Sequence, residues 1–412
     1  MKLTIDIARL SNELQTLAAF SDAPSPAVTR IVFSGHDLRA RAWFKSLCGE
    51  AELEIREDAV GNTFARWRGG EPDLPAIGTG SHTDAIPYSG RYDGTVGVLG
   101  GLEAIRALQR SGFRPRRSIE LLMFTSEEPT RFGIGCLGSR LLSGTLTPAK
   151  AAALSDSDGR TLEEVRTAAG FRGALATVAL KPDCYAGFVE LHIEQGPLLE
   201  RRNVPLGIVT AIAAPASVSI TIEGEGGHAG AVLMPDRHDA FLAAAEIALA
   251  LEAAARGTGS IDTFATTGIC EVFPGAVNSV PSRVRLAIDV RDIDAARRDG
   301  VLVILDRACA EISARRGVRT KMETINRDLP AVCDPVIIAL AIAACEKHRL
   351  AYDAMVSRAY HDSLFMSRIC PAGMIFIPCR GGFSHRPDEY ASPEAIEFGT
   401  LILAETLASL AA

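Results

Sequence analysis

The feature that most constrains the fold is a pair of short apolar segments separated by a helical pattern. Residues 74–82 (LPAIGTGSH) and 118–126 (SIELLMFTS) have the apolar character of buried strands. Between them Val98, Leu102 and Ile105 recur at the spacing of one helix face. A strand, a helix and a second strand in this order predict a βαβ unit. We therefore expect an α/β fold with a mainly parallel sheet and helices on both faces.

From about residue 214 the pattern changes. Val218, Ile220 and Ile222 alternate with polar residues, as in a strand with one solvent-facing side. A helix, two strands, a second helix and a last strand are predicted to follow at 236–256, 265–273, 282–291, 295–316 and 318–324. The resulting order β-α-β-β-α-β is that of a ferredoxin-like α+β sandwich.

The α/β pattern then returns. Residues 372–378 (AGMIFIP) predict a buried strand, and Ser392 followed by Pro393 predicts the start of the final helix. We therefore expect a catalytic domain formed by residues 1–213 and 327–412, interrupted by a lid or dimerisation domain at 214–326.

Composition narrows the classes of function. The chain has 412 residues, 47% of them hydrophobic, and a formal net charge of -7, which offers no basic surface for nucleic acid. We expect neither a secretory signal nor a membrane span, because no apolar run is long enough. Nine cysteines without tight spacing favour a reducing cytoplasm. A small-molecule substrate is therefore the default expectation.

Three of the eight histidines stand beside acids or glycines at the ends of predicted strands. They are His82 in GTGSHTD, His192 in VELHIEQG and His385 in GGFSHRPDE. Carboxylates are available from Asp93 in GRYDGTVG and from the adjacent pair Glu127 and Glu128 in FTSEEPTRFG. Each group alone is more often structural: a satisfied histidine, a helix cap or a solvated acid. Their convergence at strand ends predicts a site for two divalent ions.

Longer motifs carry a family resemblance. GSHTDAIPYSGRYDGTVGVLGGLEAI, FTSEEPTRFGIGCLGSR, ELHIEQGPLLE and GMIFIPCRGGFSHRPDEY resemble the N-carbamoyl-amino-acid hydrolase and allantoate amidohydrolase branch of the dinuclear aminoacylase and carboxypeptidase superfamily. The resemblance runs from about residue 60 to the C-terminus. VTAIAAPAS, GGHAGAVLMPDRHDA, SRAYHDSLFMSR and IFIPC are similar to the ureidoglycolate amidohydrolases within this branch. The branch usually has Asn-His-Ala-Gly-Thr around its lid histidine, and this chain departs from that pattern.

The resemblance implies a role for each candidate residue of the metal site. His82 and His192 would hold one ion, Glu128 and His385 the other, and Asp93 would bridge them. Glu127 would be the general base, and Asp84 would orient the imidazole of His82. The resemblance favours two Mn²⁺ ions, and the same mixture of imidazole and carboxylate ligands suits Zn²⁺ or Co²⁺.

The resemblance also implies substrate contacts. Gln195, Asn278 and His361 would be polar contacts, and Arg291 would pair with a substrate carboxylate. His228, in the predicted loop GGHAG, would stabilise the oxyanion from the lid of a partner chain in a homodimer. On spacing alone, Arg291 is more often a surface strand residue and His228 a loop residue.

The expected activity is hydrolysis of a linear C–N bond in a small ureido acid, with (S)-ureidoglycolate as the first choice. Allantoate and N-carbamoyl-L-amino acids share its carboxylate and ureido groups and stay open as alternatives. A dinuclear metallopeptidase is a less favoured alternative. The lid would discriminate the two, because a peptidase needs room for a longer chain, whereas a ureido hydrolase can close its lid completely. A catalytically dead binding protein is disfavoured because all candidate ligands and the candidate base are present.

Overall fold

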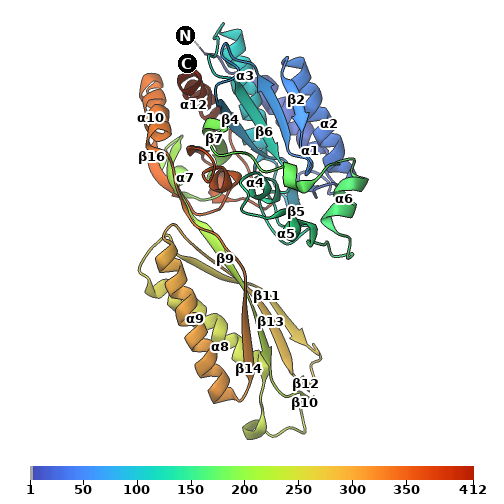
Figure 1. The fold of residues 1–412 in the computed structure, drawn as a ribbon. Helices are drawn as coiled ribbons and strands as arrows, with labels where there is room; N and C mark the ends of the chain where they lie inside the picture. Colours follow the sequence, from blue (N-terminus) through green and yellow to red (C-terminus); the bar gives the residue numbers. More distant parts are fainter. Residues whose placement is uncertain (1–2) are drawn as a thin grey trace. The chain divides into compact units, whose positions relative to one another are not determined.

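The structure, a computed structural model, describes residues 3–412 and divides into two compact units (Figure 1). The first unit runs to Thr210 and resumes over residues 332–357 and 361–412. The second comprises residues 211–331 and 358–360. The expected domain boundaries at 213/214 and 326/327 stay a prediction, because a compact unit is not shown to be an independently folding domain.

The first unit is organised around a long mixed sheet. Its strands follow one another in space as β15 (Ala331–Val332), β8 (Gly207–Ile212), β17 (Ala372–Ile377), β7 (Tyr185–Ile193), β4 (Ala76–His82), β6 (Ile119–Phe124), β3 (Thr63–Trp67) and β2 (Glu54–Glu57), with β16 (Asp353–Ser357) paired to β8. The four central strands β17, β7, β4 and β6 are parallel. β8 and β3 flank them in antiparallel pairings, and β2 pairs antiparallel with β3. The mainly parallel α/β fold is confirmed.

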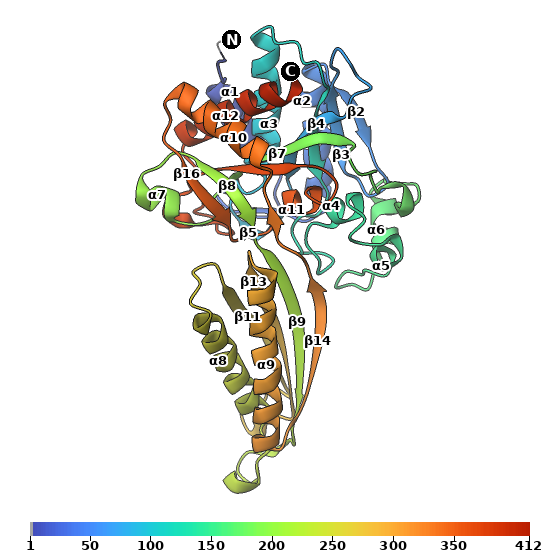
Figure 2. The same cartoon turned by 60° about the vertical axis from the view of Figure 1, so that its left-hand side comes forward.

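Helices cover both faces of this sheet, as Figure 2 shows. One face packs against α1 (Ile7–Ala19), α2 (Gly35–Glu50), α3 (Thr95–Arg110), α10 (Pro335–His348) and α12 (Pro393–Ala411). The other face carries α4 (Leu137–Leu142), α5 (Pro148–Ala152), α6 (Leu162–Ala168) and α11 (Asp362–Met366). Along β6, Leu121 and Met123 enter the first core, while Leu122 and Phe124 enter the second. Burial on both sides explains the unbroken apolar character of these strands.

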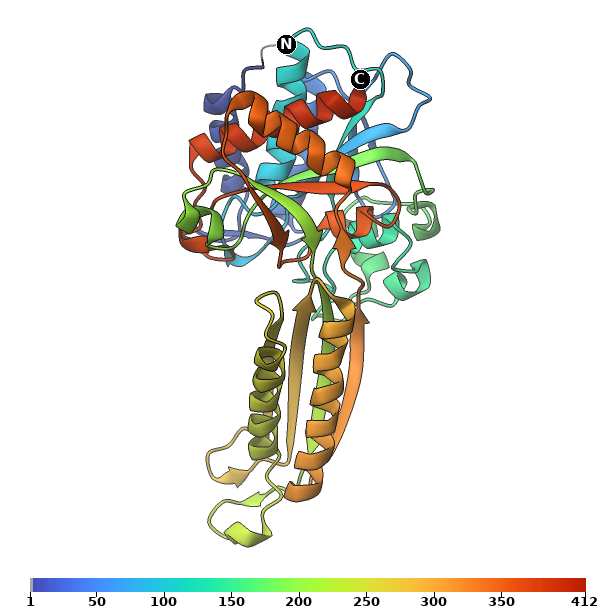
Figure 3. The same cartoon turned by 90° about the vertical axis from the view of Figure 1, so that its left-hand side faces the viewer.

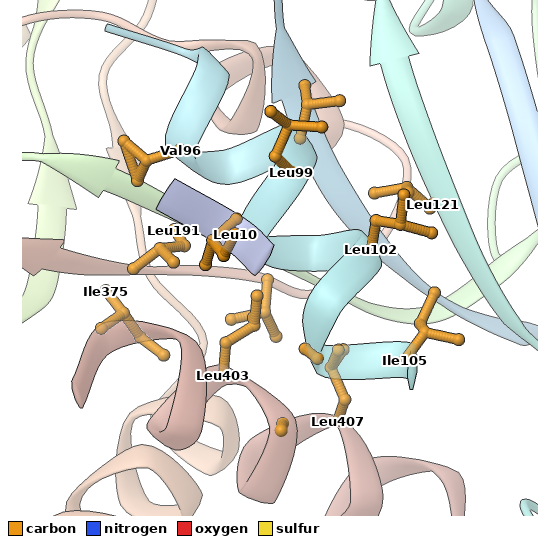
Figure 4. Close-up of a cluster of buried hydrophobic side chains, with 14 of the residues drawn as sticks. Leu10, Val96, Leu99, Leu102, Ile105, Leu121, Leu191, Ile375, Leu403 and Leu407 are labelled. Carbon is orange, nitrogen blue, oxygen red and sulfur yellow. The ribbon is translucent and has the colours of Figure 1, made fainter. Parts of the chain in front are cut away.

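Side chains from distant segments meet in the first of these cores (Figure 4). Leu121 of β6 and Leu191 of β7 lie among Leu102 of α3 and Leu403 of α12. The start of α12 is fixed as the sequence predicts, because the Ser392 hydroxyl accepts the N–H of Ala395 at 3.1 Å.

The remaining elements of the first unit are short. They are β1 (Val28–Arg30) paired with β5 (Ala85–Ser89), α7 (Leu198–Arg202), and the 3₁₀ turns η1 (Leu175–Thr177) and η3 (Arg380–Gly382). The nine cysteines of the chain are free thiols. Within residues 3–412, every helix is too short or too polar to cross a membrane.

The second unit has the predicted β-α-β-β-α-β order. Its elements are β9 (Ala214–Glu223), α8 (Ala240–Gly257), β11 (Phe264–Phe273), β13 (Arg283–Asp292), α9 (Ala295–Arg316) and β14 (Arg319–Arg327). The strands form an antiparallel sheet in the order β11-β13-β9-β14. Figure 3 shows α8 and α9 side by side on one face of this sheet. The ferredoxin-like arrangement is therefore present.

Two local predictions in the second unit need correction. The helix expected from residue 236 begins at Ala240, because Asp239 caps its first N–H groups and a 3₁₀ turn, η2 (Met234–Asp236), precedes it. The GGHAG segment, predicted as a loop, contains a two-residue strand, β10 (Gly227–His228), paired with β12 (Ser279–Val280).

Neighbouring residues of α10 test the assignment of the first core. Ile337 is 3% exposed in that core, whereas Val336 is 61% exposed on the same helical turn. Ile337→Ala should lower the free energy of unfolding by about 2–5 kcal/mol, because it leaves a cavity. Val336→Ala should change it by no more than about 0.5 kcal/mol. Urea unfolding measures both, and equal losses would contradict this packing.

Candidate metal centre

The candidate metal residues lie at the carboxyl ends of the parallel strands. His82 is the last residue of β4, and His192 is the penultimate residue of β7. Glu127 and Glu128 follow β6 within a few residues. Carboxyl ends of neighbouring parallel strands meet at one edge of a sheet, which is where ligand sites form in α/β folds.

Asp93 is the point at which the other candidate ligands meet. Its Oδ1 lies 3.2 Å from His192 Nε2 and 3.6 Å from His82 Nε2. Its Oδ2 lies 3.2 Å from His385 Nε2, and this same nitrogen lies 3.2 Å from Glu128 Oε1. Asp93 therefore contacts histidines with both carboxylate oxygens.

The ligand atoms form two sets that share Asp93. One set is His82, Asp93 and His192, and the other is Asp93, Glu128 and His385. Within each set the ligand atoms lie within 4.8 Å of one another. The structure thus brings all five residues of the predicted ligand set together in one unit, and Asp93 is common to both sets.

The electrostatics of the site reflect this arrangement. Burial alone would raise the pKa of Asp93, but hydrogen bonds with His192, His385 and His82 hold that pKa well below its usual range. Burial would lower the pKa of His385, whereas Asp93 and Glu128 raise it to about 11. These carboxylates therefore strongly attract positive charge to the same small volume.

The chemistry of the donors fits divalent cations. Imidazole nitrogens and carboxylate oxygens are the mixture that Mn²⁺, Zn²⁺ and Co²⁺ accept. Glu190, Asp362 and Glu389 add further buried carboxyl groups around the same residues, so acidic groups outnumber the histidines. Gln195 lies beside this cluster, and within the described residues 3–412 its buried Oε1 has no hydrogen-bond partner. Cations would offset this excess of buried negative charge.

Asp84 supports the two adjacent glutamates from behind. Its carboxylate oxygens accept the backbone N–H groups of Glu127 at 3.2 Å and of Glu128 at 3.0 Å. His82 Nδ1 lies 3.0 Å from the Asp84 carbonyl oxygen and 3.7 Å from its Oδ1. A donor N–H at Nδ1 leaves Nε2 as the free ligand nitrogen. The closer contact of His82 Nδ1 is therefore with the Asp84 backbone carbonyl, and an orienting role for the Asp84 carboxylate stays a prediction.

Glu127 faces the same site and does not belong to either ligand set. Its Oε2 lies 3.7 Å from His82 Nε2, and its Oε1 accepts the thiol of Cys136 at 3.3 Å. Burial raises the pKa of Glu127 well above its usual range, opposed by His82 and reinforced by Glu128. A carboxylate with raised proton affinity beside the ligands is suited to proton transfer.

Gly94 allows the two histidines of the first set to approach the chain closely. Its φ is +66°, and a Cβ built there would lie 2.4 Å from the His82 ring. Its N–H donates to His192 Nε2 at 3.1 Å. A side chain at this position would therefore push the His82 imidazole away from Asp93.

Two predicted substrate contacts of the first unit also lie at this cluster. Gln195 donates from Nε2 to Asp93 Oδ2 at 2.6 Å. The His361 ring lies 4.4 Å from the His192 ring, and its Nε2 is 3.0 Å from Ser357 Oγ. Glu190, His192 and His361 form a third group with metal-ligand spacing. Both predicted residues thus lie beside candidate metal ligands, and their contact with substrate stays a prediction.

The other predicted substrate residues belong to the second unit. His228 and Asn278 are both exposed. They lie side by side, since the N–H of Ala229, next to His228, donates to the Asn278 carbonyl oxygen at 2.8 Å. Arg291 is held by a bidentate pair with Asp289 at 2.9–3.2 Å, and its guanidinium lies 5.1 Å from the ring of Tyr360. The sequence did not predict that His228 and Asn278 are neighbours.

Several residues around the ligands were missed by sequence reasoning. Glu190 accepts hydrogen bonds from Ser81 and Ser363, which stand next to His82 and close to His361. Glu389 and Ser384 contact Asp93 or its backbone. The sequence feature that could have identified these residues is their position, either within one to four residues of a candidate ligand or within the quoted motifs.

The sequence pattern of peptidase family M20/M25/M40 matches residues 78–409. The chain is 52% identical to the ureidoglycolate hydrolase of Arabidopsis thaliana, covering 99% of this chain and 87% of that protein. It is 38% identical to the N-carbamoyl-L-amino acid amidohydrolase of Geobacillus stearothermophilus, covering 98% of each. The crystal structure of AtUAH in complex with glyoxylate superposes with a TM-score of 0.93 at 51% identity, covering 99% of this chain and 98% of that one.

Gly94 and Gly112 flank the same helix, α3, and provide a matched test of the site. Both have positive φ, but a Cβ at Gly112 would meet no atom within 4 Å. Alanine at either position should lower stability by about 1 kcal/mol through backbone strain. Only Gly94→Ala should also displace His82, and it should weaken divalent-metal binding at least about tenfold. Metal titration distinguishes the two variants, and unchanged binding in Gly94→Ala would refute the described approach of His82.

Proposed function

The chain belongs to peptidase family M20/M25/M40, and we propose that this hydrolase cuts a linear C–N bond in (S)-ureidoglycolate, releasing glyoxylate, ammonia and carbon dioxide. The observation that carries the proposal is the pair of ligand sets that share the carboxylate of Asp93. The similarity to the ureidoglycolate hydrolase of Arabidopsis thaliana over nearly the whole chain supports the choice of substrate. A role in ureide and purine breakdown within the cytoplasm belongs to the same proposal.

The proposal assigns the five ligand roles as the sequence predicted. His82 and His192 would hold one divalent ion, Glu128 and His385 would hold the second, and Asp93 would bridge them. Mn²⁺ is the proposed metal, and Zn²⁺ or Co²⁺ would suit the same donors. Such ions supply Lewis-acid polarisation of a carbonyl oxygen and lower the pKa of a water molecule.

Glu127 is the proposed general base. Its position beside His82 and its raised proton affinity suit it to take a proton from the attacking water and deliver it to the leaving nitrogen. The Cys136 thiol and the Asp84 carboxylate fix its side chain and its backbone, respectively. In this proposal Glu127 transfers the proton, while Glu128 is left to bind metal.

Recognition of the substrate is assigned to the polar groups that the sequence predicts as substrate contacts. The planar guanidinium of Arg291, already oriented by Asp289, suits a substrate carboxylate. Gln195, Asn278 and His361 are the proposed further contacts. The proposal includes a homodimer in which His228 of one chain stabilises the oxyanion at the ligands of the other chain.

Two other substrate classes are compatible with the same site chemistry. Allantoate and N-carbamoyl-L-amino acids both present a carboxylate and a ureido group. The similarity to a carbamoyl-amino-acid amidohydrolase favours N-carbamoyl-L-amino acids as the competing substrate. A dinuclear peptidase would act on longer substrates that a fully closed lid excludes. Rates on these substrate classes separate the possibilities without any assumption about lid position.

The substrate assignment is tested by rates measured side by side in Mn²⁺. We expect kcat/KM to be highest for (S)-ureidoglycolate, lower for allantoate and N-carbamoyl-L-amino acids, and negligible for dipeptides. Chelation should abolish the activity, and Mn²⁺ should restore it. A clear preference for allantoate would refute the substrate while leaving the metal chemistry in place. Full activity of a verified metal-free sample would refute the metal chemistry.

The dimer assignment is tested by mixing two inactive variants. Glu127→Gln should lose at least roughly 10²-fold in kcat, and His228→Ala about 10²- to 10³-fold, each with its metal content unchanged. If His228 acts on the partner's site, a heterodimer of the two variants has one site with both defects and one with neither. Its activity should approach half that of the wild-type dimer.

The control for this experiment is each variant mixed with itself under the same exchange conditions. Subunit exchange is verified with two different affinity tags. Exchange without recovered activity would mean that His228 acts within its own chain or has no catalytic role.

A further inference from the structure

Glu389 is a buried carboxylate directly behind the candidate bridging residue. Its side chain is 4% exposed, and its Oε1 accepts the backbone N–H groups of Tyr92 at 2.7 Å and Asp93 at 3.2 Å. Its Oε2 accepts the hydroxyl of Ser384 at 2.9 Å. The Ser384 hydroxyl also lies 2.5 Å from Asp93 Oδ2. These contacts form a closed network around Asp93, and all of them lie in the first unit.

The network joins two segments that are far apart in the sequence. Asp93 lies in the connection between β5 and α3, whereas Ser384 and Glu389 belong to the segment between β17 and α12, about 300 residues later. That second loop also carries His385, immediately after Ser384. Nothing local in the sequence sets the distance between Asp93 and His385, so a contact between the segments must set it.

The packing around Glu389 is tight on the side of the first segment. A Cβ built at Gly90 would lie 2.3 Å from the Glu389 side chain, so the chain approaches the carboxylate closely. The neighbouring Asp388 differs completely: it is exposed and pairs with Arg386 at 2.8 Å. Two adjacent acids of one loop therefore have different surroundings, and only Glu389 reaches the metal-site residues.

Placing a second carboxylate beside Asp93 has an electrostatic cost. Burial and repulsion from Asp93 raise the pKa of Glu389 to about 7, although its hydrogen bonds oppose this. A residue that served only to fill space would avoid this repulsion. What a carboxylate at position 389 contributes is therefore its set of hydrogen bonds to the segment that contains Asp93.

We propose that Glu389, acting with Ser384, is a positioning residue of the metal centre that holds Asp93 and His385 at the separation needed for the second ligand set. The proposal rests on the metal site of the proposed function. It concerns the ion of Asp93, Glu128 and His385, because Ser384 and His385 approach the same oxygen, Asp93 Oδ2. The first set contacts Asp93 through Oδ1 and depends less on this loop.

The test is a titration of metal-free protein with Mn²⁺, which counts bound ions and measures their affinities without any assay of activity. Glu389→Ala should weaken one of two ions about 10- to 100-fold, the usual effect of removing a group that orients a metal ligand. The other ion should change by less than about threefold. Glu389→Gln, which can still accept the two backbone N–H groups and contact Ser384, should restore most of the lost affinity.

Two further variants complete the design. Asp388→Ala is the matched control on the same loop and should bind both ions as the wild type does. Ser384→Ala should weaken the same single ion as Glu389→Ala, and it keeps the test valid if Glu389→Ala fails to fold. Thermal unfolding of the metal-free proteins shows whether each variant is folded.

The outcomes separate the two proposals. Normal affinity for both ions in Glu389→Ala and in Ser384→Ala would overturn the positioning role. Equal weakening of both ions together with reduced thermal stability would also overturn it, because that pattern indicates a general structural role. A wild-type protein that binds fewer than two ions would instead contradict the proposed metal site itself.

Discussion

The contact on which the rest of this structure depends is the meeting of three imidazole rings at the buried carboxylate of Asp93. A charge removed from water is tolerated only when other charges or hydrogen bonds compensate for it. His82, His192 and His385 come from two strands and a distant loop, so the segments must converge for this compensation to exist. The positive φ of Gly94, where a Cβ would lie 2.4 Å from the His82 ring, permits one of these approaches.

Buried carboxylates hold the segments that carry these ligands. Asp84 accepts the N–H groups of Glu127 and Glu128, Glu389 accepts those of Tyr92 and Asp93, and Glu190 accepts that of Ser363. In each case a buried carboxyl group accepts hydrogen bonds from a backbone segment at the end of a strand or the start of a helix. Such contacts orient a side chain more strictly than packing alone, because a buried N–H that loses its acceptor is costly. The ligand-bearing segments are therefore hydrogen-bonded on the side that faces the sheet.

Much of this arrangement could be predicted from the sequence. Hydrophobic periodicity located β4, β6, α3 and the six elements of the second unit, because burial on one or two faces controls the pattern directly. The five ligand candidates were predicted because each stands at the end of a strand or in a recognisable motif. Glu389, Ser384 and Cys136 were not predicted as contacts. Their partners lie up to about 300 residues away, or depend on a left-handed backbone at Cys136 (φ +55°), and no periodic pattern records such features.

Asp93 is common to both candidate ligand sets, and the number of metal ions bound per chain tests its role most directly. Metal-free wild-type protein and three variants would be titrated with Mn²⁺, and the bound ions counted after gel filtration. The account predicts two ions per chain for the wild type and for Glu127→Gln, one for Glu128→Gln, and none at the same concentration for Asp93→Ala. A wild type that binds a single ion, or an Asp93→Ala variant that keeps both, would contradict it.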